Sequence, residues 1–353
     1  MALSKTHEAL ITKVCAVGGG ELGITLDDAV CSYLIAVISA DLGVLDKFLE
    51  FTRPVLPFFG KQPLVRLRAP GHDFRALFEK LIGLRQDADA YFYCLATLHK
   101  ARLKYELILQ SQPVPTIDQV GPRALLQYGS LSPSALGGFL IWRKWIYDID
   151  NRAAQETGYV FEPIIAYAIG GVPASAKKSP VKRLGGGSGR QVDCIREADK
   201  RAYEFKLRVT IAASGQGRWQ EELEFPEDCR ASGYTPVLVV LDPTANPKLT
   251  QLRKAFEAQK GETYVGAEAW KHLEGKAGRT MATFLRKYVQ ETLDSLLREV
   301  PKALPDLTLT VRNEQLTVKV GTERLKIRRN PKRQLASLAD EHPEDADDHS
   351  LNP

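Results

Sequence analysis

The chain has 353 residues, of which 44% are hydrophobic and 26% are charged. This composition is typical of a soluble globular protein with one large or two ordinary domains, and it excludes a disordered or fibrous protein. The net charge of +5 conceals an acidic end: without the six acids of residues 334–353, the chain has 48 basic and 37 acidic residues, a balance of +11. Such a body favours a polyanionic partner, nucleic acid first, although a mildly basic enzyme is equally compatible with it.

The sequence contains no pattern that would send the chain to or across a membrane. Its first ten residues lack a basic stretch leading into an apolar run, and the apolar segment 29–40 is too short to span a bilayer. A cytoplasmic protein is therefore expected. The cysteines are odd in number and widely spaced, so we expect reduced, mostly buried thiols. They are Cys15, Cys31, Cys94, Cys194 and Cys229.

Residues 1–150 form a first region that reads as mainly helical. Apolar residues recur at three- and four-residue spacing over 26–49 and 74–109, and prolines punctuate the connections between these stretches. In the second stretch they form one stripe, consisting of Phe74, Leu77, Phe78, Leu81, Ile82 and Leu84. Few strand signals occur in this part of the chain.

Residues 151–303 form a second region with mixed helix and strand signals. It opens with a helix over 151–170, interrupted or staggered near Gly158 and Pro163, and a loop rich in glycine and basic residues follows. The order helix, strand, strand, helix, strand predicts a mixed sheet flanked by helices. The expected elements after the loop are strands at 191–195 and 202–207, a helix at 216–232, a strand at 236–241, and helices at 248–259 and 279–300.

Residues 304–333 are expected to form a basic β-hairpin. Leu307, Leu309 and Val311 alternate with polar residues, the same pattern recurs after Asn313-Glu314, and that pair is expected to form the turn. The basic residues of 324–333 could clamp a nucleic-acid backbone, or the hairpin could extend an interface between two copies of the chain. The acidic tail, 334–353, is expected to be disordered.

The segment 191–207 carries the candidate chemistry. If the turn between its two short strands is centred between Ala198 and Asp199, Asp193 stands directly opposite Glu204. Directly opposed residues on antiparallel strands have Cβ atoms about 4.5–5.5 Å apart on one face of the sheet. Two bare carboxylates there repel each other, and a divalent cation between them removes the conflict. The scattered histidines offer no comparable metal site.

Lys206 extends this pair. It lies two residues beyond Glu204 and so points to the same face of the strand. An ammonium group beside the metal, near a bound phosphate, can orient an attacking water and stabilise charge on the phosphate. The alternative is an exposed charged hairpin face with no chemistry. Hydrophobic neighbours such as Cys194, Tyr203 and Phe205 argue against it, because they leave little of this hairpin free to face water.

Asp193, a short spacer and Glu204-Phe205-Lys206 resemble the D…ExK signature of the PD-(D/E)xK nucleases. Val192 stands where many members of that superfamily have proline. The order of elements over 151–241 is also similar. The resemblance implies an α/β (α+β) restriction-endonuclease-like core: a mixed central sheet flanked by helices, with the helical first region and the C-terminal hairpin as additions. It also implies Mg²⁺ held by Asp193, Glu204 and the main-chain carbonyl of Phe205.

These nucleases often take a further glutamate from the helix that precedes the first strand. The candidates here are Glu156 and Glu162. The stretch GYVFE, which ends at Glu162, resembles the usual ending of that helix, so Glu162 is the choice. The resemblance gives it the role of ordering a metal-bound water or a second ion, and the alternative is a solvated helical glutamate.

Among such nucleases the chain is most similar to the type II restriction endonucleases, with an overall resemblance to the ApaLI-like group in its helical first half and the strand GYTPVLVVLD. The resemblance implies hydrolysis of double-stranded DNA at a short specific sequence, leaving 5′-phosphate ends. It also implies a homodimer and a cognate DNA methyltransferase in the same cell. The alternatives are a repair or recombination nuclease of the same superfamily, and a non-catalytic DNA-binding protein in which the motif is accidental.

The loop before Asp193 is a candidate for gripping DNA phosphates around the scissile bond, and the alternative is a flexible solvated linker. Two polar residues at the start of the helix after the second strand are further candidates. The glycines of the loop lack the GxxxxGK[ST] spacing, so no nucleotide cofactor is expected. The candidate DNA-binding residues are Lys177, Lys178, Lys182, Arg183, Arg190, Gln216 and Arg218.

Overall fold

The computed structural model of the chain describes residues 3–16, 24–186, 188–207, 216–299 and 301–330, with the backbone alone at 216–218. Its centre is a five-stranded mixed sheet in the order β1–β2–β3–β4–β5. The first two pairings are antiparallel and the last two parallel. The strands are β1 (Val172–Ala174), β2 (Val192–Arg196), β3 (Arg201–Lys206), β4 (Thr235–Val240) and β5 (Glu262–Val265).

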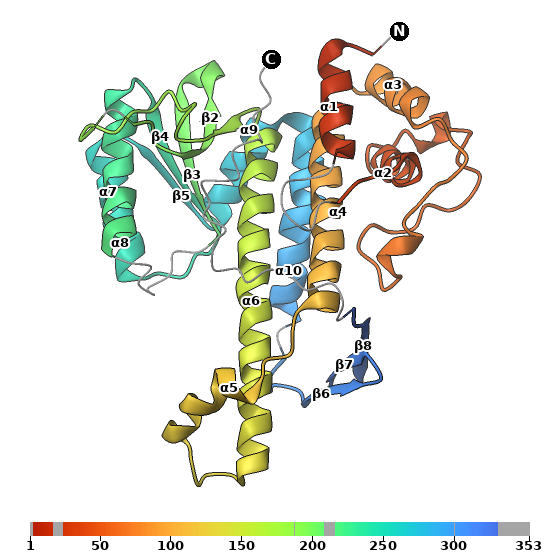
Figure 1. Cartoon of the computed structure of the whole chain (residues 1–353). Coiled ribbons are helices and arrows are strands. Elements are labelled where there is room, and N and C mark those ends of the chain that lie inside the picture. The colour runs from red at the N-terminus through yellow and green to blue at the C-terminus, as the bar shows by residue number, and fades with distance from the viewer. Residues whose placement is uncertain (1–2, 17–23, 187, 208–215, 300, 331–353) are drawn as a thin grey trace.

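Helices cover both faces of this sheet, as Figure 1 shows. On one face lie α7 (Gln216–Ala231) and α8 (Pro247–Ala258), and on the other lie α6 (Pro133–Ala168) and α9 (Ala267–Leu285). Separate apolar clusters fill the two sides: Phe225, Leu252 and Phe256 pack under α7 and α8, whereas Tyr203 and Phe205 of β3 pack toward α6 and α9. The predicted mixed sheet flanked by helices is confirmed, and the architecture is restriction-endonuclease-like.

The first region is helical in the part that the structure describes. Its helices are α1 (Lys5–Cys15), α2 (Asp28–Asp41), α3 (Phe74–Leu84), α4 (Ala88–Ser111) and α5 (Ile117–Val120). The stripe predicted on α3 buries Phe74, Leu77, Phe78 and Leu81, while Leu84 is exposed. This region shares one continuous apolar core with α6, α9 and the sheet.

The long helix α6 joins the two regions. It runs without a break from Pro133 to Ala168, although the sequence favoured a helix starting near residue 151 and interrupted near Gly158 and Pro163. Residue 150, where the two regions were divided, therefore lies inside a helix. Pro163 is tolerated within α6. Packing of this helix against α4, β1, β2 and α9 outweighs the missing hydrogen bond of the proline.

Two further predictions needed correction. A strand, β5, and the first half of α9 were not foreseen between 260 and 278, and Gly278, with φ of 67°, kinks α9 where the predicted helix was to begin. The C-terminal hairpin is a three-stranded antiparallel sheet of β6 (Leu307–Arg312), β7 (Gln315–Val320) and β8 (Glu323–Arg328). Its predicted turn is confirmed, because Arg312 pairs with Gln315 across Asn313 and Glu314, both at positive φ. Among the described helices none is long and apolar enough to cross a membrane.

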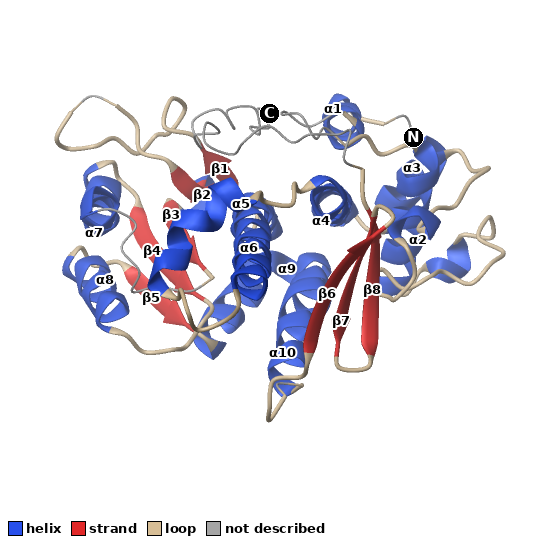
Figure 2. Cartoon of the chain, turned by 60° about the horizontal axis from the view of Figure 1, so that its bottom comes forward, coloured by secondary structure: helices blue, strands red, loops and turns tan. Residues whose placement is uncertain are grey.

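The small sheet stands apart from the central one, with α6 and α10 (Glu291–Arg298) between them in Figure 2. Leu316 and Ile327 anchor it by packing against Trp145 and Ile149 of α6. Backbone bonds from Arg329 to Glu314 and from Asn330 to Gln110 close its end against α4. The predicted free thiols are confirmed, and all five cysteines are buried except Cys15, which is partly exposed.

Asp41, at the end of α2, ties the first region to the helical segment that directly follows α9. Its side chain is 2% exposed and accepts hydrogen bonds from the hydroxyls of Tyr91 and Tyr288, the former at 2.9 Å. We expect Asp41→Ala to lower the free energy of unfolding by about 2–4 kcal/mol, because two buried hydroxyls lose their acceptor. Urea unfolding measures this. The neighbouring exposed Asp46→Ala is the control, and equal effects of both changes would contradict the role given to Asp41.

Candidate active site

The hairpin of β2 and β3 has the register that the sequence predicted. Cys194 pairs with Tyr203, Ile195 with Ala202 and Arg196 with Arg201, so the turn is centred between Ala198 and Asp199. Extending this register by one residue places Asp193 opposite Glu204. The amide of Phe205 donates a hydrogen bond to Asp193 Oδ2 at 2.8 Å, which holds the carboxylate on β3.

The alternation of β3 decides which layer the charged residues face. Tyr203 and Phe205 enter the core on the α6 and α9 side, whereas Ala202 packs with the cluster under α7 and α8. Glu204 and Lys206 follow Ala202 at two-residue steps and therefore point to the α7 side. All the predicted catalytic side chains on these strands are partly buried, so this is not a freely solvated hairpin face.

Lys206 lies between two carboxylates. Its Nζ is 2.7 Å from Glu204 Oε1 and 3.4 Å from Glu222 Oε1 of α7. Burial lowers the pKa of the Lys206 ammonium, but the charges of Glu204, Glu222 and Asp193 more than offset this and raise the pKa above its ordinary value. Lys206 is therefore charged at neutral pH.

Glu162 approaches the same group from α6. Burial, and after it the charge of Glu204, raises the pKa of Glu162 to about 7. The charge of Lys206 partly opposes this shift. Glu156, the other glutamate considered on this helix, is ion-paired with Lys104 at 2.7 Å. The structure thus places Glu162, and not Glu156, beside the carboxylates of the sheet.

The cluster has more negative than positive charge. Burial first, and then the charges of Glu204 and Glu162, raises the pKa of Asp193 well above its usual range. Three carboxylates from α6, β2 and β3 and a fourth from α7 surround one ammonium group. Such a group lacks positive charge unless it binds protons or a cation. This imbalance is the physical reason to expect a cation here.

The donors suit a hard divalent cation. Among the described residues, no three His, Cys, Asp or Glu side chains by themselves form a metal-holding group. A zinc site usually needs three or four protein side chains. Mg²⁺ needs fewer, since it usually takes one or two protein carboxylates and completes its shell with waters and phosphate oxygens. Asp193 and Glu204, with main-chain and water oxygens, satisfy that requirement.

The glycine-rich loop is fixed on α7 and not free. Lys182 pairs with Gly189 across it, and the Lys182 amide donates to Ser232 Oγ at 2.9 Å. Arg183 forms an ion pair of 3.2 Å with Glu221. Arg190 is 5% exposed and is bound to Asp228, so it anchors the loop and is not placed to meet a phosphate. This corrects its assignment as a DNA contact.

The remaining predicted DNA contacts fall into two groups. Lys177 and Lys178 are exposed on the turn that follows β1. Gln216 and Arg218 belong to the first turn of α7, but their side chains lie outside the described residues. Glu222 was not singled out from the sequence, because acidic and basic residues surround α7 and no pattern marks which side of this helix meets β3.

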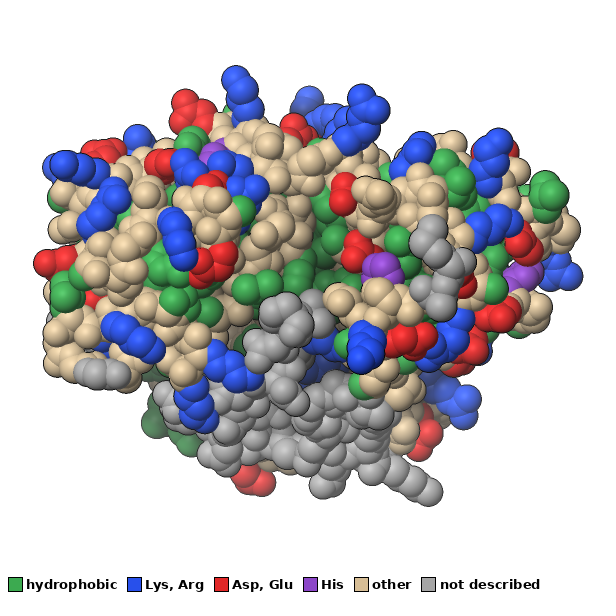
Figure 3. Space-filling model, turned by 90° about the horizontal axis from the view of Figure 1, so that it is seen from above, with side chains coloured by type: hydrophobic (Ala, Val, Ile, Leu, Met, Phe, Trp, Pro, Cys, Tyr) green, Lys and Arg blue, Asp and Glu red, His purple; other side chains and the backbone are tan. Residues whose placement is uncertain are grey.

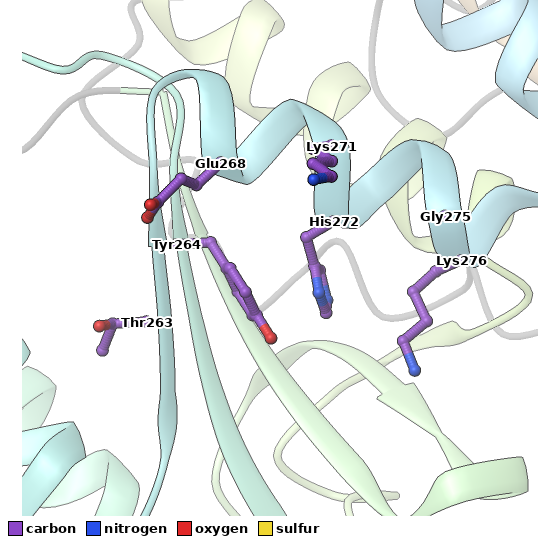
Figure 4. Close-up of a pocket in the computed structure, with 7 residues that line it drawn as sticks. All are labelled: Thr263, Tyr264, Glu268, Lys271, His272, Gly275 and Lys276. Atoms are coloured by element: carbon purple, nitrogen blue, oxygen red, sulfur yellow. The ribbon is translucent and has the colours of Figure 1, made fainter.

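A separate hollow of about 620 Å³ lies between β5 and α9 and contains none of the predicted site residues. In Figure 4, Tyr264 and His272 lie side by side beneath α9, and their rings stack at 3.9 Å. Burial lowers the pKa of His272 to about 4. Lys276, at its rim, is bound to Asp199 at 2.8 Å. The ring stack and this ion pair join α9 to the sheet.

The mixed sheet, with opposed carboxylates and a lysine on its second and third strands, defines the restriction-endonuclease-like class of proteins. The model of the ApaLI-like restriction endonuclease family matches residues 72–290. The type II restriction enzyme ApaLI of Acetobacter pasteurianus is 48% identical over 277 residues, 74% of each chain. The chain belongs to the ApaLI-like restriction endonuclease family, and no solved structure matches it.

Glu162→Gln is expected to stabilise the metal-free protein at pH 8. A carboxylate whose pKa rises from 4.5 to about 7 on folding destabilises the folded state when ionised, most fully above pH 7. Below the pKa of the unfolded chain, Glu162 is protonated in both states and does not destabilise the fold. The variant should therefore gain on the order of 1–3 kcal/mol in free energy of unfolding at pH 8, and this gain should vanish near pH 4. Urea unfolding in EDTA measures it, with Glu156→Gln as the control. A less stable Glu162→Gln protein at pH 8 would contradict the crowding of carboxylates described above.

Proposed function

We propose that the protein is a Mg²⁺-dependent type II restriction endonuclease, which hydrolyses double-stranded DNA at a short specific sequence and leaves 5′-phosphate ends. The observation that carries the proposal is the closeness of Asp193 and Glu204, which the register of the hairpin places opposite each other, with Lys206 on the same face. The 48% identity to a type II restriction enzyme supports the DNA substrate. Such an enzyme works in the cytoplasm beside a methyltransferase that protects the same sequence.

Each residue of the site has a distinct part in the proposed reaction. Asp193, Glu204 and the main-chain carbonyl of Phe205 would hold the ion, and Glu162 would order a water from the α6 side. Bound Mg²⁺ supplies a Lewis acid that polarises the phosphate and favours ionisation of water. The displacement is in line: the bond to the 3′ oxygen breaks as the water oxygen bonds to phosphorus, the proton of the water passes to solvent, and the leaving 3′ oxygen takes a proton from solvent.

Lys206 acts as a donor in this scheme. Because the surrounding carboxylates raise its pKa, its ammonium group is charged and is not a proton acceptor at neutral pH. Glu204 and Glu222 hold the group in place before substrate binds. It can then orient the attacking water and stabilise the charge that develops on the phosphate without reorganisation.

The basic turn before β2 brings positive charge to the substrate. Lys177 and Lys178 are exposed there, and we assign them and the partly held Lys182 and Arg183 to phosphates next to the scissile bond. Gln216 and Arg218 are proposed to contact the same DNA from the first turn of α7. None of these residues is assigned to base recognition.

Lys206→Ala should lower the cleavage rate by at least about a hundred-fold, in the range reported for losing one preorganised charge stabiliser. DNA affinity in EDTA should change little. The measurement is digestion of a mixed-sequence plasmid with Mg²⁺ or EDTA, read as discrete fragments on a gel. Lys200→Ala, an exposed lysine on the same hairpin, is the matched control. Normal cutting by Lys206→Ala would reject this assignment, and absence of Mg²⁺-dependent fragments from the wild-type protein would reject the proposed activity.

We propose further that the enzyme acts as a homodimer, because cutting both strands of a palindrome requires two sites related by a twofold axis. The tip formed by α5 and the following turn supports this. There Leu125 is 83% exposed, Leu126 89% and Tyr128 72%. Figure 1 shows this tip projecting at the lower end of α6, away from α1, α2 and α3. A contiguous exposed apolar surface of this kind marks protein interfaces.

Leu125→Glu together with Leu126→Glu should convert the protein to a monomer and replace double-strand cuts by nicks. Light scattering at micromolar concentration and plasmid nicking assays measure the two effects. Leu49→Glu, at an 84% exposed leucine of the first region, is the control. A wild-type protein that is monomeric both alone and on DNA would refute the dimer. A double variant that still forms the dimer would show that Leu125 and Leu126 do not belong to the interface.

A further inference from the structure

The three-stranded sheet β6–β8 has two chemically different faces. Cross-strand pairing puts Val311, Leu316 and Ile327 in one row, and these belong to the face that packs on α6. The intervening positions belong to the opposite face and look away from the body. Because the side chains of each strand alternate, the register assigns every residue of the sheet to one face or the other.

The outward face is basic. Its three rows pair Arg312 with Gln315 and Arg328, Thr310 with Thr317 and Lys326, and Thr308 with Lys319 and Arg324. Five of these nine positions are Lys or Arg and none is Asp or Glu. With 48 Lys and Arg in 353 residues, only about one cation would be expected in nine positions. The enrichment is therefore a property of this face and not of the chain as a whole.

The five cations are free to meet a ligand. All of them are exposed, and within the described part of the chain none is ion-paired. Among the described residues, the ion pair that involves this sheet joins Lys61 to Glu323, which belongs to the other face. Figure 3 shows a contrasting surface at the opposite end of the molecule, where the visible Lys and Arg side chains are interspersed with Asp and Glu.

The dimensions of the face suit an extended polyanion. Three strands about 4.8 Å apart, and rows separated by about 7 Å at two-residue steps, give a patch of roughly 10 by 14 Å. Threonines between the cations add short hydroxyl donors. Flat basic surfaces with interspersed hydroxyl groups are suited to phosphate oxygens, which take half or more of all protein–DNA hydrogen bonds.

We propose that the outward face of β6–β8 is a second DNA-binding surface, which holds the phosphate backbone outside the sequence that is cut. The inference rests on the proposed function for its choice of partner. It concerns a part of the chain that lies beyond the matched family region, residues 72–290. The face adds affinity without regard to sequence, because its cations are arranged for phosphates and not for base edges.

The test compares the wild-type protein with the triple variant Arg324→Gln, Lys326→Gln and Arg328→Gln, which neutralises one strand of the face. Affinity for a DNA duplex in EDTA is measured by fluorescence anisotropy between 50 and 200 mM salt. Each neutralised phosphate contributes about 0.9 to the slope of log K against log salt. We expect the slope of the triple variant to be shallower by about 2–3, with at least about ten-fold weaker binding at 100 mM.

Two controls make the outcome decisive. The variant Lys5→Gln, Arg253→Gln and Lys254→Gln removes the same charge from exposed positions on α1 and α8 and should leave the slope unchanged. Arg324→Lys with Arg328→Lys keeps the charge and should bind as the wild type does. An unchanged slope in the test triple, an equal loss in the control triple, or a loss confined to duplex RNA would overturn the proposal. Because these assays contain no divalent cation, they can fail independently of cleavage, which reports on the proposed activity.

Discussion

The rest of the site depends on the repulsion between Asp193 and Glu204. A tight hairpin places the two carboxylates on directly opposed positions, and the amide of Phe205 prevents Asp193 from turning away. Burial first, and then the nearby charges of Glu204 and Glu162, raise the pKa of Asp193. The folded state bears this cost because the core on both sides of the sheet holds the register. In the proposed enzyme, a bound cation would relieve this repulsion, so the instability of the metal-free arrangement would favour metal binding.

Three layers of the fold, α6, the central sheet and α7, contribute charged side chains to the site. The helix α6 brings Glu162 to the sheet, and the same helix carries the first region and the small C-terminal sheet. The helix α7 adds Glu222 next to Lys206, and its other acids hold the basic loop. The site is thus completed from both faces of the sheet, and the lysine is charged and positioned before DNA binds.

Local patterns predicted the parts of the structure that local geometry determines. The register of β2 and β3 and the Asn313–Glu314 turn were correct, because hairpins are specified by alternation and turn residues. The continuity of α6 through Pro163 and the partner of Lys206 on α7 were not foreseen. Both depend on packing between segments distant in sequence, which periodicity does not encode. Arg190 was misassigned for the same reason, since its partner Asp228 is 38 residues away.

The most direct test of this account is metal binding without DNA. Calorimetric titration of the wild-type protein with Mg²⁺ or Mn²⁺ should give a saturable signal, and Asp193→Asn should weaken binding by at least about ten-fold. The substitution keeps the shape of the side chain and an oxygen that can accept the bond from Phe205, so the hairpin should persist. Equal affinity in the two proteins, or no binding by the wild type at millimolar metal, would contradict the claim that these opposed carboxylates form a metal-dependent active site.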